Sequence, residues 1–234
     1  MFRTVTNHAG EREDLRLDVY MPEGDARADR RAILWIHGGG FRPGNDKRQS
    51  YIVRIATEFA RRGYVCVSCD YRVREEPFSD LAGTFRDAAD DCRAALAWIA
   101  AHAEAYGVRA DRVVVGGGSA GGMTAVTLCA LEAADGPSVG VPPIAALVNL
   151  WGSPSPEAYL APVDGRFPPT IIVHGTADQL VPYTYSVALA ALLEGSRVRH
   201  DLITIEGAPH TPVAHMPVFS EEIARFLDEV LGGR

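Results

Sequence analysis

Ser119 lies in a segment whose residue types and spacing could support nucleophilic catalysis. In GGGSAGG, residues 116–122, Gly117, Ser119 and Gly121 match the pattern G-x-S-x-G. At a sharp strand-to-helix turn, this spacing exposes the serine hydroxyl, and the glycines remove side chains that would collide with the strand and the helix. A strand pattern, DRVVVGG, precedes the serine, and a helical pattern, MTAVTLCALEAA, follows it. A phosphate-binding loop would need a lysine that this segment lacks, whereas a plain tight turn remains an alternative.

A carboxylate and a histidine follow two later strand patterns. Asp178 lies just after the apolar run TIIVHG, and His210 lies in EGAPHTP, after the run HDLITIE. A histidine in hydrogen-bond reach of a serine can accept its proton, and an acid behind the histidine keeps the imidazole in the required tautomer. Asp164 is the rival acid, but it precedes its strand, and His215 is the rival base, five residues beyond His210. We predict His210 as the base and Asp178 as the acid.

The segment HGGGF, from His37 to Phe41, directly follows the apolar run AILWIH. Three consecutive glycines allow backbone N–H groups to point into a cavity, where they could stabilise an oxyanion. Loss of one such donor typically raises the barrier by about 3–4 kcal/mol. The amide of Ala120, directly after the candidate nucleophile, is a further donor of this kind. We expect His37 to hold the glycine loop by hydrogen bonds and not to act as the base.

The elements that must position these residues alternate between strand and helix along the chain. Strands are expected in RTVTNH, LRLDVYMP, AILWIH, YVCVSCD, DRVVVGG, PPIAALVNLWG, PPTIIVHG and HDLITIEG, and helices over 46–63, 84–107, 119–134, 185–193 and 221–233. This alternation predicts an α/β fold with a mostly parallel central sheet and helices on both faces. The two opening strands could add an antiparallel edge. No Pro/Gly-rich linker divides the chain, so we expect one domain over residues 1–234.

Composition narrows the choice of partners. The formal charge is −7, and an acidic surface makes nucleic acid and anionic membranes poor partners. No signal peptide is visible, and no stretch approaches the ~18 apolar residues of a membrane span, so we expect a cytoplasmic protein. Cys66 and Cys69 form a C-x-x-C within the buried strand pattern YVCVSCD, where residues three apart point to opposite faces. We therefore expect these two cysteines, like Cys92 and Cys129, to pack in the core.

Together, HGGGF, GGSAGG and the order Ser, Asp, His resemble the α/β-hydrolase superfamily, specifically compact carboxylesterases with an HGGG oxyanion loop. The resemblance extends from about Leu15 to Leu231. HGGGF, GGSAGG and CDYRV look like the hormone-sensitive-lipase-like esterases. Little sequence precedes the first strands, where that group has an N-terminal cap, and HGTADQLVP looks like acetyl-xylan, feruloyl and dienelactone-type hydrolases. The resemblance implies the α/β-hydrolase fold with little or no cap, and oxyanion amides from Gly39, Gly40 and Ala120.

The expected function is a serine hydrolase that cleaves small or accessible carboxylic esters through an acyl-enzyme, without a metal or organic cofactor. Phe41, Trp151 and Tyr159 are candidate pocket residues, because each lies near the expected carboxyl edge of the sheet. A formamidase, thioesterase, peptidase or acyltransferase could use the same triad, and a non-catalytic binding module could use the same fold. The expected partner is a small-molecule ester, with no nucleic acid and no membrane, and a homodimer is left open.

Overall fold

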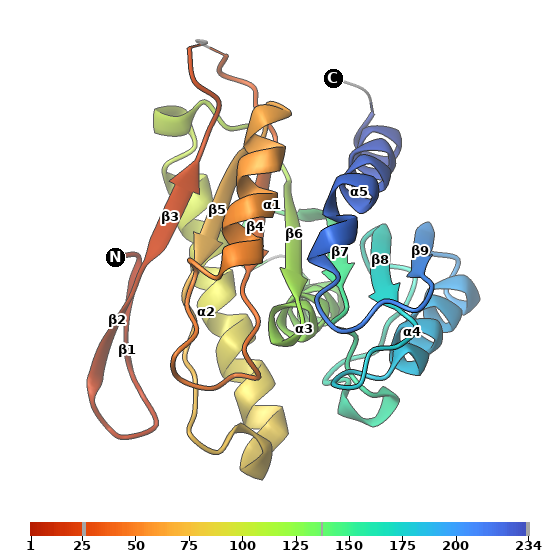
Figure 1. The fold of residues 1–234 in the computed structure, drawn as a ribbon. Coiled ribbons are helices and arrows are strands. Elements are labelled where there is room, and N and C mark those ends of the chain that lie inside the picture. Colours follow the sequence, from red (N-terminus) through yellow and green to blue (C-terminus); the bar gives the residue numbers. More distant parts are fainter. Residues whose placement is uncertain (25–26, 137, 233–234) are drawn as a thin grey trace.

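A sheet of seven strands, in the order β3-β5-β4-β6-β7-β8-β9, runs through the middle of the molecule (Figure 1). The computed structural model describes residues 1–24, 27–136 and 138–232. β3 pairs antiparallel with β5, and all other neighbours in the sheet are parallel. The strands are β3 (Leu17–Tyr20), β4 (Ala32–Ile36), β5 (Val65–Cys69), β6 (Val113–Gly118), β7 (Ile144–Leu150), β8 (Thr170–Gly175) and β9 (His200–Ile205). The predicted α/β fold with a mostly parallel sheet is confirmed.

Helices cover both faces of this sheet. The helices α1 (Ser50–Arg61) and α5 (Met216–Leu231) pack on the face toward the viewer in Figure 1. The opposite face is covered by α2 (Leu81–Ala101), α3 (Ala120–Asp135) and α4 (Tyr183–Gly195). Every residue of β4 is buried, and successive side chains enter the two apolar clusters in turn. Burial on both faces explains why the strands read as continuous apolar runs.

The order of the strands reverses beside β4. From β4 the chain moves to β5 through α1, and it then returns past β4 to β6 through α2. The loops after β4 and β6 therefore leave adjacent strands in opposite directions. In open α/β sheets, such a reversal opens a crevice at the carboxyl ends of the strands, where ligands bind. The glycine loop follows β4 and Ser119 follows β6, so both segments lie at this crevice.

The N-terminal strands differ from the expectation. The predicted strand LRLDVYMP is interrupted at Arg16, whose N–H donates to the Asp70 carboxylate at 3.2 Å. Only β3 joins the main sheet, whereas β1 (Arg3–Thr6) and β2 (Arg12–Leu15) form a separate antiparallel pair. Three short strands thus replace the expected two, and one of them provides the antiparallel edge.

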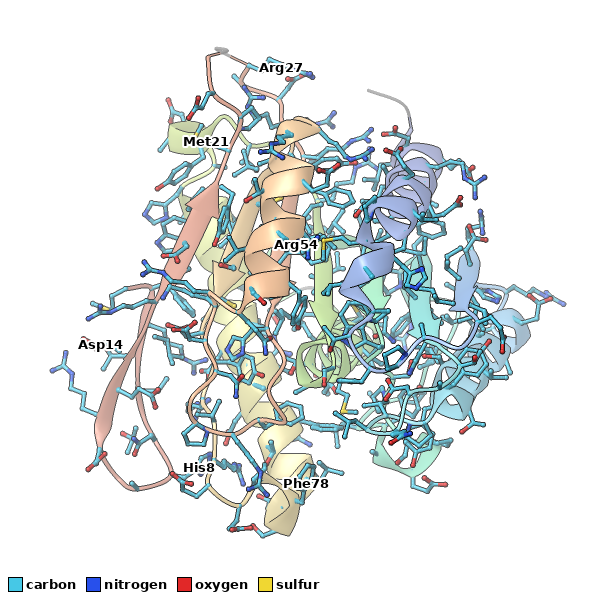
Figure 2. All side chains as sticks on the ribbon, in the orientation of Figure 1. His8, Asp14, Met21, Arg27, Arg54 and Phe78 are labelled. Carbon is cyan, nitrogen blue, oxygen red and sulfur yellow. The ribbon has the colours of Figure 1, made fainter. Side chains whose placement is uncertain are left out.

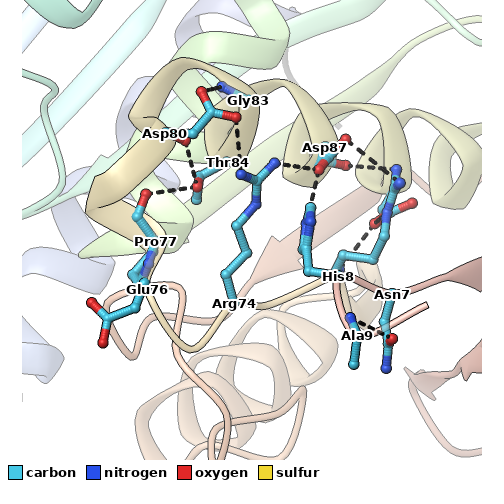
Figure 3. Close-up of polar contacts among 12 residues, drawn as sticks. Asn7, His8, Ala9, Arg74, Glu76, Pro77, Asp80, Gly83, Thr84 and Asp87 are labelled. Atoms are coloured by element: carbon cyan, nitrogen blue, oxygen red, sulfur yellow. Dashed lines mark hydrogen bonds and ion pairs between the residues drawn. The ribbon is translucent and has the colours of Figure 1, made fainter. Parts of the chain in front are cut away.

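Ion pairs attach this N-terminal hairpin to α2. The buried carboxylate of Asp91 receives Arg3 at 2.7 Å and Arg72 at 2.8 Å. One turn earlier on the helix, Asp87 pairs with His8 at 3.0 Å and with Arg74 at 2.7 Å (Figure 3). Because Asp91 is fully buried, removing either guanidinium partner should be destabilising, and Arg3 is the partner that links the hairpin to the helix.

Helices α2, α4 and α5 begin before the positions expected from apolar periodicity, α4 by only two residues. Helix α2 begins at Leu81, because the Asp80 carboxylate accepts the Gly83 N–H at 2.9 Å and caps the first turn (Figure 3). Helix α5 begins at Met216 with Pro217 in its first turn, where a missing N–H costs nothing. A side-chain cap thus marks the start of α2, whereas a proline in the first turn marks the start of α5.

The four cysteines are buried and form no disulfide. Cys66 and Cys69 lie in the apolar clusters on opposite faces of the sheet, in keeping with a packing role. Burial raises the pKa of the Cys66 thiol to about 12. Within the described residues, no helix combines the length and the apolar composition that crossing a membrane requires.

Candidate active site

Ser119 occupies the turn between β6 and α3. Its backbone has φ 56° and ψ −125°, a conformation that costs free energy for an L-residue and recurs at functional turns. The Ser119 N–H donates to the Leu150 carbonyl at 3.0 Å. A Cβ on Gly121 would overlap the carbonyl oxygen of Ile36, and one on Gly117 would overlap Gly121. Glycine is therefore required on both sides of the serine, as the motif predicts.

Three side chains from distant parts of the chain form one series of hydrogen bonds at the carboxyl edge of the sheet. His210 Nε2 lies 2.9 Å from Ser119 Oγ, and His210 Nδ1 lies 2.7 Å from Asp178 Oδ2. Asp178 follows β8, and His210 follows β9. Because Nδ1 must donate to the carboxylate, Nε2 is free to accept the serine proton. The series can therefore move a proton from the hydroxyl to the imidazole.

The Asp178 carboxylate is fully buried, yet each of its oxygens has partners. Oδ1 accepts the N–H groups of Leu180 at 2.8 Å and Val181 at 3.0 Å, and Oδ2 also receives His174 Nε2 at 3.0 Å. Burial raises the pKa of Asp178, but the hydrogen bonds from His210 and from the two amides outweigh it, so the pKa is lowered. The acid is therefore ionised at neutral pH and can support a protonated His210.

The rival residues lie elsewhere. Asp164, between β7 and β8, pairs with Arg166 at 2.8 Å. His215 is exposed at the start of α5. Across the described parts of the chain, neither residue has a hydrogen bond to Ser119, His210 or Asp178.

His37 supports the glycine loop after β4. Its Nδ1 donates to the Gly38 carbonyl at 2.8 Å, its ring stacks on Tyr71, and the Tyr71 hydroxyl donates to the His37 carbonyl at 2.9 Å. On the other side of the loop, the Gly38 N–H donates to Gln49 Oε1 at 2.9 Å. Burial lowers the pKa of His37, which keeps the ring neutral. These contacts agree with the expectation that His37 holds the glycine loop by hydrogen bonds and does not act as the base.

Gly39 and Gly40 form the bend of this loop, with φ 108° and 63°. They line one pocket together with Ser119 and Ala120. Among the described residues, no backbone carbonyl accepts the Gly39 or Gly40 N–H. Donors that face a cavity beside the nucleophile could stabilise an oxyanion, and the Ala120 amide, at the start of α3, adds the positive end of a helix dipole.

The pocket above Ser119 has a volume of about 460 Å³ and mainly apolar walls. Its lining comprises Gly38, Gly39, Gly40, Phe41, Gln49, Tyr51, Phe78, Ser119, Ala120, Met123, Leu180, Val181, His210 and Thr211. Phe78 lies at the edge of the molecule beside the start of α2 (Figure 2) and is 65% exposed, while Leu180 is 75% exposed. The mouth of the pocket is therefore open to solvent.

Of the three predicted pocket residues, only Phe41 lines this pocket. Trp151 is fully buried and packs edge-on against Tyr51 and Phe219, behind the site. Tyr159 packs against the apolar cluster on the face of α2, α3 and α4. Both predictions were wrong, because an aromatic residue near a strand end can turn toward the core as readily as toward the crevice.

His174 was not among the predicted site residues, yet it contacts the candidate acid. This histidine is in β8, four residues before Asp178, and its side chain is fully buried. Strand periodicity indicates the face on which such a residue lies but not its partner. The spacing H-G-T-A-D at the end of an apolar strand was the one available signal.

This chain is similar in fold and sequence to known proteins. A solved esterase from Thermogutta terrifontis, with propionate bound, is 27% identical with a TM-score of 0.73, over 93% of this chain and 90% of that one. A deep-sea metagenome hydrolase, MGS-M1, is 21% identical with a TM-score of 0.75, over 98% of both chains, and supports the fold alone. Hormone-sensitive lipase of Mus musculus is 28% identical over 72% of this chain but only 21% of its own length.

The family comparison agrees with these similarities. The chain spans about a fifth of the length of three curated relatives that it matches. The BD-FAE family model matches residues 17–137, more than half of the chain, from the edge strand β3 through the glycine loop and Ser119 to the end of α3. The expected resemblance to α/β-hydrolase carboxylesterases is confirmed, and the chain belongs to the BD-FAE family of that fold.

Proposed function

We propose that this protein is a serine hydrolase that cleaves carboxylic esters with short acyl groups through a covalent acyl-enzyme. The observation that supports it most is the continuous series from Ser119 Oγ through His210 to the ionised carboxylate of Asp178, at 2.9 and 2.7 Å. A nucleophile, a base and an orienting acid in this order are the components of the serine hydrolase mechanism. The esterases and lipases among its relatives support the same chemistry.

In the proposed reaction, Ser119 Oγ attacks the ester carbonyl while His210 Nε2 takes the hydroxyl proton. The resulting oxyanion is stabilised by the amides of Gly39, Gly40 and Ala120. His210 then protonates the leaving alcohol, and the carbonyl re-forms as an acyl-enzyme. A water molecule repeats the cycle with His210 as its base, which releases the acid and restores the serine. Asp178 holds the imidazole in place and stabilises its charged form in both stages.

The pocket supports a preference for short acyl chains. Its volume of about 460 Å³ and its apolar lining suit a small ester, and its open mouth offers no long enclosed channel for a fatty chain. In the connection between β7 and β8, which passes near the site, the only regular element among the described residues is a 3₁₀ turn over Pro156–Ala158. The Thermogutta terrifontis esterase has been solved with propionate and with butyrate bound, both short carboxylates.

The catalytic role of the serine is tested by Ser119→Ala. We expect the variant to lose p-nitrophenyl acetate hydrolysis by about 10⁴-fold or more and to lose labelling by a fluorophosphonate probe, because it lacks the hydroxyl that forms the proposed acyl-enzyme. Ser155→Ala is the matched control: this serine lies outside the pocket and should leave both readouts unchanged. Labelling that persists in Ser119→Ala, or no labelling of the unmodified protein, would reject the proposed function.

Acyl-chain preference is tested with a series of p-nitrophenyl esters. We expect kcat/KM to be highest for acetate to butyrate esters and to fall for chains of about ten carbons or more, because the pocket has no walls to bury the additional methylenes. Steady-state rates below the critical micelle concentration provide the measurement. Faster cleavage of long-chain esters would contradict the short-acyl preference while leaving the serine mechanism intact.

A further inference from the structure

A second histidine, besides His210, contacts the candidate acid. His174 Nε2 lies 3.0 Å from Asp178 Oδ2, the same oxygen that receives His210 Nδ1 at 2.7 Å. His174 comes from within β8, whereas His210 lies in a loop, and the His174 ring is fully buried. The carboxylate is thus held between a histidine anchored in the sheet and the histidine that faces the nucleophile.

A buried polar series continues behind His174. Its Nδ1 lies 2.7 Å from Ser186 Oγ, which lies 2.8 Å from Ser153 Oγ, and Asn149 Nδ2 donates to that oxygen at 2.8 Å. All four side chains belong to fully buried residues. They come from β7, the loop that follows it, β8 and α4, so the series links the acid to three elements of the fold.

The partners of His174 determine where its proton lies. Nε2 faces two acceptors, Asp178 Oδ2 at 3.0 Å and the Val181 carbonyl at 3.1 Å, so it must carry hydrogen. Burial lowers the pKa of His174 despite the neighbouring carboxylate, so the ring holds one proton and not two. Nδ1 must then accept from the Ser186 hydroxyl. Ser186 in turn accepts from the Ser153 hydroxyl. Ser153 accepts from the Asn149 amide, which is the first donor of the series.

We propose that His174 is a positioning residue, which acts through its neutral Nε2–H to fix the Asp178 carboxylate and to share its negative charge. This inference rests on the proposed function, because His174 does not contact Ser119 and could affect the reaction only through Asp178 and His210. With Oδ1 held by two backbone amides and Oδ2 by His174, the carboxylate cannot rotate away from His210. The hydrogen bond from His174 also takes up part of the negative charge of Asp178, so the carboxylate stabilises a protonated His210 less strongly.

Two amide substitutions separate the hydrogen bond from the volume of the ring. In His174→Gln, the amide nitrogen reaches the position of Nε2 and can still donate to Asp178. In His174→Asn, the amide reaches only the position of Nδ1, so the contact with Ser186 can persist while the contact with Asp178 is lost. Both replacements are polar and uncharged, so they differ mainly in reach.

We expect His174→Asn to lower kcat for p-nitrophenyl acetate by about ten- to a hundredfold with little change in KM, by analogy with the loss of a hydrogen-bond partner that orients a metal ligand. The acid limb of kcat/KM should move to higher pH by about half a unit, because a less shared carboxylate stabilises protonated His210 more strongly. His174→Gln should restore kcat to within about threefold of the unmodified protein and return the acid limb to its original position.

The outcomes that overturn this role are distinct from those that reject the hydrolase function. Equal losses in both variants with an unmoved acid limb would mean that the ring only packs, and unchanged kinetics in both would mean that its hydrogen bond has no effect; either result overturns the proposal. Hydrolysis by the unmodified protein that persists in Ser119→Ala would instead reject the proposed function.

A spectroscopic measurement tests the tautomer without any substrate. In long-range ¹H–¹⁵N NMR spectra of histidine-labelled protein, one ring whose signals vanish in His174→Gln should show a protonated Nε2 and an unprotonated Nδ1 from pH 6 to 8. A ring protonated at Nδ1, or at both nitrogens, in this range would overturn the proposal, whatever the activity.

Discussion

Two adjacent glycines show how much the site depends on single residues. A Cβ added to Gly39 would overlap the side chain of Asn45, whereas one added to Gly40 would meet nothing within 4 Å. Both have positive φ, so each alanine carries a backbone cost of about 1–2 kcal/mol. Only the change at Gly39 also has to displace a neighbour, and Asn45 accepts a hydrogen bond at 3.3 Å from Gln49, which supports the loop.

At this scale we predict that Gly39→Ala lowers kcat by about 100-fold or more, because the amides proposed to bind the oxyanion would move with the loop. Gly40→Ala should lower kcat by less than about tenfold. Steady-state kinetics with a short-chain ester provides the measurement, and urea unfolding shows whether the variants are folded. Equal losses of kcat in Gly39→Ala and Gly40→Ala would mean that the Asn45 side chain moves aside without displacing the loop.

At the scale of elements, backbone strain gathers in the loops around the site. Among the described residues, five that are not glycine have positive φ, and four of them follow strands at the carboxyl edge of the sheet or lie beside the candidate base: Phe41, Ser119, Trp151 and Thr211. Such conformations persist only where the surrounding packing holds them. The close contact of α3 with the end of β4, through Gly121 and Ile36, is part of that packing.

We therefore predict that Gly121→Ala destabilises the protein by about 1–3 kcal/mol, because the added methyl must push α3 away from the Ile36 and His37 carbonyl oxygens. The control is Gly195→Ala at the end of α4, where a Cβ meets nothing within 4 Å and φ is not positive. Alanine favours helix, so this control should be neutral or slightly stabilising. Urea unfolding compares the two variants, and a Gly121→Ala as stable as the unmodified protein would contradict the close contact.

At the scale of the whole molecule, stability should depend on pH through buried histidines. Burial lowers the pKa of His37 and of His174 below that of an unfolded histidine, near 6.5. The unfolded chain therefore binds more protons than the folded one as the pH falls below about 6.5, so stability must rise with pH across this window. Because the pKa of Asp178 is lowered in the folded protein, protonation of this carboxylate further reduces stability at more acidic pH.

We predict that the free energy of unfolding falls from pH 7.5 to pH 5.5 and that His37→Asn flattens this slope. The surface variant His215→Gln removes an exposed histidine and is the matched control, which should leave the slope as it is. Urea titrations at several pH values measure both. A slope that is unchanged in His37→Asn would show that this ring does not contribute to the loss.

The sequence by itself determined the alternation of strands and helices, the α/β class and the candidate residues for the chemistry. Those features are local: an apolar run, a glycine beside a strained turn, and a serine, an aspartate and a histidine that each follow a strand. The helices predicted over 84–107 and 221–233 exist, but α2 begins at Leu81 and ends at Ala101, and α5 begins at Met216 and ends at Leu231. Such boundaries depend on caps and turns that apolar periodicity does not specify.

The tertiary structure alone decided which side chains meet. It turned Trp151 into the core and left Phe41 in the pocket, separated the N-terminal hairpin from the sheet, and placed His174 against Asp178. Periodicity specifies the face of a strand but not the element packed against it, because that choice depends on the simultaneous packing of loops from β4, β6, β8 and β9. Which side chains meet at the carboxyl edge of the sheet depends on packing between distant segments, and no single segment of the sequence specifies it.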